Sequence, residues 1–235
     1  MMQNRRFPVR EAAVSYQFFL YKFPESEIEH PVRTYYNTSM KHHTGSGRPI
    51  LSGCARYSAE RSLTMAALIA FYSRAGENYF GGAYRRISVG NTEKVAEMLA
   101  DLTGGELYKI EQAEPYSDDY KTCVAQARED WQKNARPAVL DLPDDLDAYD
   151  EIYLGYPNYC STMPMVVYTF LEHYDFTDKT IHPFCTHEGS GLSDTENDIR
   201  KTAHGAAVTK GLAIHGSHVD EAKSALAQWV EEFAK

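Results

Sequence analysis

Apolar residues between positions 65 and 235 occur either in short unbroken runs or at the spacing of one helix face. The run Ala66–Tyr72 has the length and composition of a fully buried strand. The next apolar pattern, over Asn91–Thr103, has helical spacing and ends at two glycines, which commonly terminate helices. The same alternation predicts strands at Glu106–Ile110, Tyr149–Tyr156, Thr180–Thr186 and Ala206–Ile214, and helices at Asp118–Asn134, Thr162–Tyr174, Ser193–Thr202 and Val219–Phe233.

Three of these predicted helices contain further local sequence features. Ser193 and Glu196 have the S-x-x-E spacing of a capping box, in which both side chains cap the first helical turn. Pro164 fits the first turn of its helix, where no backbone N–H is needed. The inward side of the helix over 118–134 is predicted to carry Tyr120, Val124, Ala127 and Trp131.

Strands that alternate with helices predict an α/β domain with right-handed crossovers and a parallel sheet. Five strands and five helices favour a doubly wound sheet of order 2-1-3-4-5 with helices on both faces. Ligands of such sheets bind beyond the carboxyl ends of the strands, where the winding direction reverses. We therefore expect the functional residues in the loops after the first, third and fourth strands.

The first 64 residues lack a sustained helical or strand period. The part from Tyr35 to Ser62 is rich in small polar residues, His and Arg, which bury too little apolar surface to offset the entropy of ordering. We interpret 1–64 as an irregular N-terminal extension and 65–235 as the domain. Because the first strand follows Met65 directly, Met65 could also be the natural start of the protein.

The two parts of the chain differ in charge. Residues 1–64 carry nine basic and five acidic side chains, whereas residues 65–235 carry fifteen basic and twenty-eight acidic ones, a balance of −13. An acidic surface repels phosphate backbones and anionic lipids and attracts basic proteins. We therefore expect partner proteins with basic docking faces, and neither nucleic acid nor a membrane as a binding partner.

The cysteines indicate a reducing compartment. The chain has four, at Cys54, Cys123, Cys160 and Cys185, with neither C-x-x-C nor metal-ligand spacing. No segment approaches the roughly 20 apolar residues that cross a bilayer, and the N-terminus makes a poor signal peptide. These features predict a cytoplasmic protein with reduced thiols.

The loop after the first strand has the residues of a phosphate site. It begins at Ser73 and ends at Gly90, Asn91 and Thr92, where the first helix is predicted to start. The free N–H groups and the positive dipole end of a helix N-terminus attract phosphate. Asn91 or Thr92 could equally be a simple helix cap.

The other two loops suit a planar ring. After the third strand, Pro157 and Pro164 stiffen a loop in which Tyr159 offers a flat face for stacking. After the fourth strand, Gly189 and Gly191 allow the backbone to approach a ligand, and His187 titrates near neutral pH. Alone, each loop could be an ordinary surface turn. Together, a phosphate site and a ring site at one sheet edge describe a flavin nucleotide.

Several motifs taken in order resemble the flavodoxin family: Phe71-Tyr72-Ser73, Gly90-Asn91-Thr92, Gly155-Tyr156-Pro157, Thr162-Met163-Pro164 and the run from Phe184 to Gly191. More closely, residues 65–235 are similar to the flavodoxin-like branch with a lengthened first loop. The resemblance implies noncovalent flavin mononucleotide (FMN). The residues it implies at the phosphate are Ser73, Arg74, Ala75, Gly90, Asn91 and Thr92, and those at the ring are Pro157, Asn158, Tyr159, Cys160, Thr186, His187, Gly189, Ser190 and Gly191.

Two features depart from the family pattern. The segment from Gly76 to Val89 interrupts the usual compact phosphate loop, and Asn78, Tyr79, Tyr84 and Arg85 within it could form a lid. Tyr159 stands where the family tends to place tryptophan.

The resemblance implies electron transfer between redox partners, or in related branches reduction of quinones and similar acceptors with NAD(P)H. The sequence leaves carrier and NAD(P)H-dependent enzyme open. A receiver-type signalling domain would share the strand order but needs acidic residues after the first and third strands, where this chain has Ser73 and Tyr156-Pro157. The chain also lacks a zinc-binding H-E-x-x-H, a Walker lysine and a G-x-G-x-x-G after the first strand.

Overall fold

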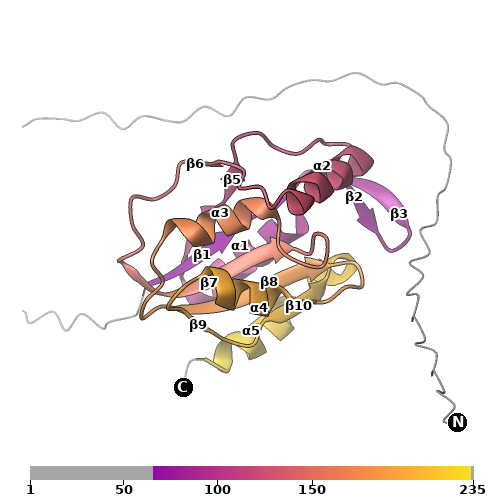
Figure 1. Cartoon of the computed structure of the whole chain (residues 1–235). Helices are drawn as coiled ribbons and strands as arrows, with labels where there is room; N and C mark the ends of the chain where they lie inside the picture. Colours follow the sequence, from indigo (N-terminus) through magenta and orange to yellow (C-terminus); the bar gives the residue numbers. More distant parts are fainter. Residues whose placement is uncertain (1–65, 234–235) are drawn as a thin grey trace, which may run out of the picture. The chain divides into compact units, whose positions relative to one another are not determined.

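The predicted strands assemble into one central parallel sheet (Figure 1). The computed structural model describes residues 66–233. The strands β1 (Ala66–Phe71), β4 (Glu106–Lys109), β7 (Tyr149–Pro157), β8 (Thr180–His187) and β10 (Leu212–His215) lie in the order β4-β1-β7-β8-β10. This is the predicted doubly wound order 2-1-3-4-5. The predicted extension over 1–64 lies outside the described residues.

Helices cover both faces of this sheet. The first face packs against α1 (Asn91–Thr103), the 3-10 helix η1 (Gly216–Glu221) and α5 (Lys223–Glu231), and the second against α3 (Met165–His173) and α4 (Thr195–Thr202). The helix α2 (Tyr120–Gln132) lies beside α3. Successive residues of β1 point to opposite faces, so Ile69 and Phe71 join the first core while Leu68 and Ala70 join the second.

The predicted fifth strand, Ala206–Ile214, is interrupted. The short strand β9 (Ala207–Val208) and β10 both pair with β8, and residues 209–211 separate them. The N–H of Thr209 donates to the carbonyl of Ile181 (3.0 Å), so the backbone groups of Ile181 point toward β9 and β10. The backbone groups of every second residue in a strand point the same way, so those of Pro183, two positions after Ile181, also point toward β9 and β10. Because proline has no N–H to donate, the ladder breaks opposite Pro183.

The same break explains why the predicted capping box does not form. The Glu196 carboxylate accepts from the N–H of Gly211 (2.6 Å), and the Ser193 hydroxyl donates to the carbonyl of Ser190 (3.2 Å). Asp194 is the N-cap of α4, but its side chain accepts from the Asn197 amide (3.3 Å) and caps no backbone N–H. Glu196 therefore satisfies a backbone group that the interrupted strand leaves unpaired.

Replacing Glu196 with alanine should lower the free energy of unfolding by about 1–2 kcal/mol, because the half-buried N–H of Gly211 loses its charged acceptor. Urea denaturation measures this loss. Glu231→Ala, which removes an exposed carboxylate at the end of α5, is the matched control. A loss no larger than that of the control would show that water replaces Glu196 without cost.

Two helices differ from their predicted form. In α2 the buried residues are Cys123 and Ala127, whereas Trp131, predicted to face inward, is 48% exposed. The helix lies at the margin of the sheet and buries only a narrow strip, so its outer aromatic residues remain in solvent. In α3, Pro164 is the N-cap rather than part of the first turn.

The insertion over 76–89 forms an antiparallel hairpin of β2 (Gly76–Phe80) and β3 (Ala83–Ile87). Its turn is Gly81-Gly82, and both glycines have positive φ, 50° and 104°, as a tight two-residue hairpin turn requires. Figure 1 shows the hairpin beside α2. A second small sheet pairs β5 (Glu111–Gln112) with β6 (Val139–Leu140).

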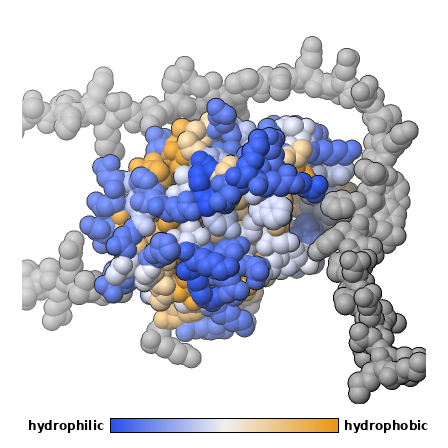
Figure 2. All heavy atoms as spheres, in the orientation of Figure 1, coloured by the Kyte–Doolittle hydropathy of each residue, from blue (hydrophilic) through white to orange (hydrophobic). Residues whose placement is uncertain are grey.

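The surface is mostly polar. The face seen in Figure 2 carries polar residues over most of its area, and its apolar residues form small separate areas. Large exposed apolar or aromatic side chains among the described residues come from the hairpin, β4, α2 and β6. Within residues 66–233, no helix has both the length and the apolar character needed to span a bilayer.

Candidate functional site

A cleft opens at the carboxyl ends of β1, β7 and β8, where the sheet topology predicts a site. The cleft has a cavity volume of about 130 Å³, and the rest of the space at its mouth is open to solvent. Nine predicted site residues line it: Ser73, Arg74, Asn91, Thr92, Pro157, Asn158, Tyr159, Thr186 and His187. The three predicted loops therefore converge on one cleft.

The N-terminus of α1 forms one side of the cleft. The N–H of Glu93 donates to the Ser73 hydroxyl (3.1 Å), while the N–H groups of Asn91 and Thr92 have no hydrogen-bond partner among the described residues. The buried hydroxyls of Thr92 and Thr186 contact each other at 2.8 Å and join this helix end to β8. Free amides and hydroxyls at a helix N-terminus make a site for an oxyanion.

Gly90 lets the loop after β1 lie directly on this helix end. A Cβ atom at Gly90 would collide with the Ser73 hydroxyl and lie 2.7 Å from the carbonyl oxygen of Arg74. Gly90 itself does not line the cleft, but its missing side chain brings the backbone of the loop against α1. The part of the loop that carries Ser73 and Arg74 is therefore in contact with the start of α1 at Gly90.

The Arg74 guanidinium is already occupied by protein groups. Its five N–H donors are matched by contacts to the carbonyls of Ser117 (3.1 and 2.8 Å), Asp118 (2.8 Å) and Glu77 (2.7 Å) and to the Asn78 side chain (3.3 Å). Arg74 thus ties the hairpin to the loop before α2 and keeps no spare donor for a ligand. Ala75 lies outside the cleft and lines a neighbouring cavity.

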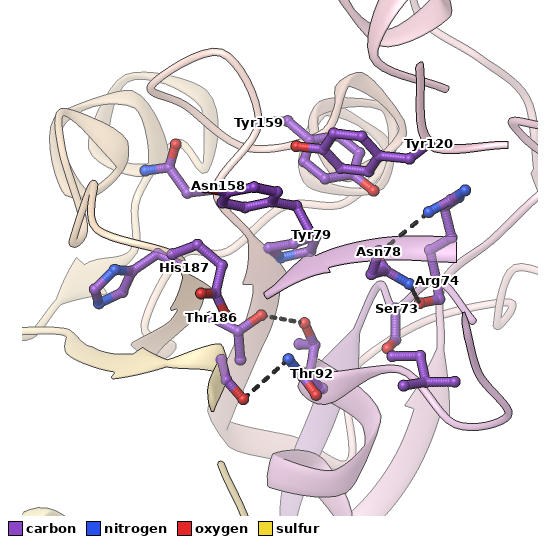
Figure 3. A pocket seen from close by; sticks show the side chains of 15 residues that line it. Ser73, Arg74, Asn78, Tyr79, Thr92, Tyr120, Asn158, Tyr159, Thr186 and His187 are labelled. Atoms are coloured by element: carbon purple, nitrogen blue, oxygen red, sulfur yellow. Dashed lines mark hydrogen bonds between the residues drawn. The ribbon is translucent and has the colours of Figure 1, made fainter. Parts of the chain in front are cut away.

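Tyrosine side chains form the opposite side of the cleft (Figure 3). The Tyr159 ring meets Tyr72 edge to face, with centroids 6.4 Å apart, and its hydroxyl lies 4.0 Å from Cys123 Sγ. Burial raises the pKa of Tyr159 well above its usual range, so the phenol stays neutral. Tyr79 of the hairpin and Tyr120 of α2 stack at 6.3 Å and complete the aromatic side.

The loop after β8 contributes His187. Its Nδ1 accepts from the N–H of Gly189 (2.9 Å), which leaves Nε2 to carry the proton of the neutral ring. Burial, together with the neighbouring His215, lowers the pKa of His187 and favours this neutral form. The imidazole can therefore offer one N–H donor at neutral pH.

The other predicted ring residues do not line the cleft: Cys160, Gly189, Ser190 and Gly191. Cys160 is exposed and has a positive φ of 53°. The carbonyl of Gly191 accepts from the Asn158 amide (3.0 Å), so this part of the loop supports the loop after β7. These four residues belong to the loops around the cleft but do not border its interior.

Sequence reasoning missed some of the lining. Ile87, Tyr120, Glu188 and Gly216 border the cleft together with Asn78 and Tyr79, which the sequence suggested only as part of a lid. Gly216 follows β10, whose carboxyl end meets the same sheet edge, so the topology could have indicated it. Tyr120 carries no local signal, because the packing of α2 alone brings it there. Within 66–233 there is no cluster of His, Cys, Asp or Glu suited to a metal ion.

Comparisons with known proteins agree with this architecture. A family model described as flavodoxin matches residues 82–233. A crystal structure of a protein assigned as a flavoprotein from Bacteroides uniformis has a TM-score of 0.58 and 25% identity, and the match covers 71% of this chain and 98% of that chain. A similar assigned flavoprotein from Bacteroides eggerthii has a TM-score of 0.59 and 24% identity, with 72% and 98% covered. No curated protein matches the chain.

Proposed function

This chain belongs to the flavodoxin family, and from that premise we propose that its cleft binds one FMN and that the protein carries electrons between redox partners. The observation that carries the proposal is the convergence of the loops after β1, β7 and β8 on one cleft. One side of that cleft offers free amides and hydroxyls, and the other offers tyrosine rings.

The donors at the start of α1 fit a phosphate group. The amides of Asn91 and Thr92 have no partner within residues 66–233, and the adjacent loop is held against them by Ser73. The dipole of α1 favours a negative charge at this end. Because Arg74 is bound to carbonyl groups, we propose that backbone amides and hydroxyls hold the phosphate without a side-chain cation.

The tyrosine side fits a planar, largely apolar ring. Tyr159 is fixed by Tyr72 and by a two-way backbone bridge to Thr162, with both N–H···O distances at 2.9 Å. A side chain held in this way loses little entropy on binding a ring. His187 Nε2–H lies at the same cleft as a hydrogen-bond donor for a polar ring atom.

When bound, FMN supplies the capacity to accept and donate electrons, and the chain supplies position and access. Residues 65–235 carry a net charge of −13. That charge would attract partner proteins with basic docking faces and speed their encounter at low ionic strength. We propose such proteins as electron donor and acceptor.

An NAD(P)H-dependent oxidoreductase acting on quinones or similar acceptors is the second candidate. The observation that favours it is the hairpin at the mouth of the cleft, where Tyr79 and Tyr84 are partly exposed beside Tyr120. Exposed aromatic rings next to a bound flavin would suit a second planar substrate.

Two measurements test these proposals. Protein purified in the presence of FMN should be yellow and should retain one FMN per chain after gel filtration; a colourless protein would refute the cofactor. Mixing the FMN-loaded protein with NADPH alone in a stopped-flow instrument then separates the candidates. Slow reduction is expected for a carrier, whereas rapid bleaching of the flavin absorbance would establish the oxidoreductase.

We expect Tyr159→Ala to weaken FMN binding by about 1–3 kcal/mol, because the ring loses stacking and buried contact. Titration of FMN fluorescence measures the change in Kd. Tyr159→Phe, which keeps the ring, is the control and should bind normally. If Tyr159→Ala binds as tightly as the wild type while Tyr79→Ala does not, the flavin stacks on the hairpin instead.

A further inference from the structure

The β2–β3 hairpin is held at two separate places. Its base is tied to the loop before α2, because Arg74 bridges Glu77 to Ser117 and Asp118. The N–H of Glu77 donates to the carbonyl of Asp118 (3.1 Å), and the Glu77 carboxylate accepts from the N–H of Tyr120 (3.1 Å). The base is therefore firmly anchored on the α2 side of the cleft.

The tip of the hairpin, residues 80–83, reaches the opposite side. The N–H of Gly81 donates to Glu188 Oε2 (2.9 Å), and among the described residues this is the only hydrogen bond between the tip and the rest of the domain. Phe80 is buried, whereas Gly81, Gly82 and Ala83 are exposed. The hairpin is thus held by several hydrogen bonds at its base, whereas its tip is held by one hydrogen bond and by the buried Phe80 ring.

Glu188 is well placed to control that attachment. It follows His187 in the loop after β8 and lines the cleft. Its Oε2 also accepts from the Ser217 hydroxyl (3.3 Å) and lies 3.9 Å from His215 Nε2. Its Oε1 is buried against Gly216, where any Cβ would collide with it, and has no hydrogen-bond partner in the described part of the chain. Neighbours on three sides fix the carboxylate beneath the hairpin tip.

A buried oxygen without a partner reduces the net gain from placing Glu188 here. The tip has fewer hydrogen bonds to the rest of the domain than the base has, so it is the end of the hairpin that we expect to open first. Because Glu188 belongs to a cleft loop, a ligand that orders this loop also orders the tip.

We propose that Glu188 is a positioning residue that holds the hairpin tip across the cleft mouth and so slows the exchange of bound FMN. This inference rests on the proposed function, because it assigns FMN to the cleft. The hairpin opens from its tip and turns about its Arg74-anchored base, and FMN leaves while the tip is released.

Dissociation of FMN from the loaded full-length protein tests this inference. Glu188→Ala is expected to release FMN about tenfold faster than the wild type, because the tip loses a charge-assisted hydrogen bond. Glu188→Gln keeps an acceptor oxygen and should restore most of the slow release. The control is Glu221→Ala, an exposed carboxylate nearby in η1. Equal release rates for wild type and Glu188→Ala would overturn the proposal.

A reversible crosslink at the hairpin tip should slow the release of FMN, whereas Glu188→Ala should speed it. The Cβ position of Gly81 lies 3.7 Å from the Ser217 hydroxyl oxygen, so Gly81→Cys with Ser217→Cys could form a disulfide between the tip and η1. Because a cysteine at the positive φ of Gly81 strains the turn, the reduced double variant is the reference. In a Cys160→Ser background, oxidation should slow FMN release several-fold, and reduction should restore it. Release that is unaffected by oxidation, with the crosslink confirmed by mass, would show that FMN does not leave past the tip.

A third measurement needs no flavin. In the FMN-free protein, Glu188→Ala should speed trypsin cleavage after Arg85 and Arg86, which lie in β3, relative to wild type and Glu221→Ala. If the wild type fails to bind FMN, the proposed function is refuted. The trypsin measurement on the FMN-free protein still decides whether Glu188 holds the hairpin. If FMN binds but neither its release nor the cleavage depends on Glu188, the function stands and this inference is refuted.

Discussion

Gly90→Ala is expected to raise the Kd for FMN by at least roughly 100-fold, because it displaces the loop that forms the phosphate side of the cleft. The backbone of Gly90 is extended, with φ at −69°, so alanine is not excluded by its dihedral angles. Alanine does not fit sterically, because its Cβ would collide with the Ser73 hydroxyl and the Arg74 carbonyl. The carbonyl is backbone and cannot rotate away, so the loop must leave the start of α1.

Fluorescence titration with FMN measures this effect, and circular dichroism establishes that the variant is folded. Ser88→Ala, an exposed change in the same loop, is the control and should bind normally. Ser73→Ala is a milder variant that removes the acceptor of the Glu93 N–H and one hydroxyl on the phosphate side, but leaves space for the loop. We expect it to weaken binding less than Gly90→Ala does. Tight FMN binding by folded Gly90→Ala would place the phosphate elsewhere.

His182→Ala is expected to lower the free energy of unfolding by about 3 kcal/mol. The imidazole is 1% exposed and lies on β8 between the rings of Tyr153 (4.8 Å) and Phe233 (4.2 Å). Its Nε2–H donates to the Glu151 carboxylate (2.6 Å), and its Nδ1 lies 3.1 Å from the Thr209 hydroxyl. Alanine would leave a cavity and remove both hydrogen bonds.

The same substitution should change how stability depends on pH. Burial lowers the pKa of His182 below its usual value, despite the nearby Glu151 carboxylate. As the pH falls from about 6.5 toward the lowered folded pKa, the unfolded chain binds the proton first, so the wild type loses stability. Below the folded pKa this loss is complete and constant. His182→Ala should lack this component, while His187, whose pKa is also lowered, keeps a component of the same sign.

Urea denaturation at several pH values between 5 and 8 measures both effects. The control is His204→Ala, which removes an exposed imidazole after α4 and should leave the free energy of unfolding nearly unchanged. If His182→Ala were as stable as this control, the buried hydrogen-bonded imidazole would contribute nothing to the fold. If the free energy of unfolding of His182→Ala depended on pH as strongly as that of the wild type, the pH dependence would belong to another group.

Local patterns predicted most of the secondary structure. The helix over Asn91–Thr103 was predicted to the residue, because its apolar spacing is regular and Gly104 ends it with a φ of 70°. The parallel strands were recognisable because burial on both faces makes them continuously apolar. The fifth strand was not, because its interruption depends on Pro183 in a neighbouring strand. The hairpin was missed although its Gly81-Gly82 turn is a known local signal.

The candidate site was predictable where it follows from topology. Loops after adjacent parallel strands must meet at one edge, so the sequence alone could place Ser73, Thr92, Tyr159 and His187 together. Arg74 shows the limit of this reasoning, since a charged residue in a phosphate loop turns out to donate to carbonyls 43 and 44 residues away. Which partner a side chain selects depends on groups that no local pattern identifies.

The sequence alone determined the family, the order of the strands and the edge at which the cleft lies, because periodicity and the sheet topology are properties of short segments and of their order. Only the tertiary structure decided that Glu196 serves Gly211 instead of its own helix, that Tyr120 borders the cleft and that Glu188 holds the hairpin tip. Each of these contacts joins groups far apart in the chain. Their partners are set by competition among all the donors and acceptors that packing brings within reach, and this competition exists only in the folded chain.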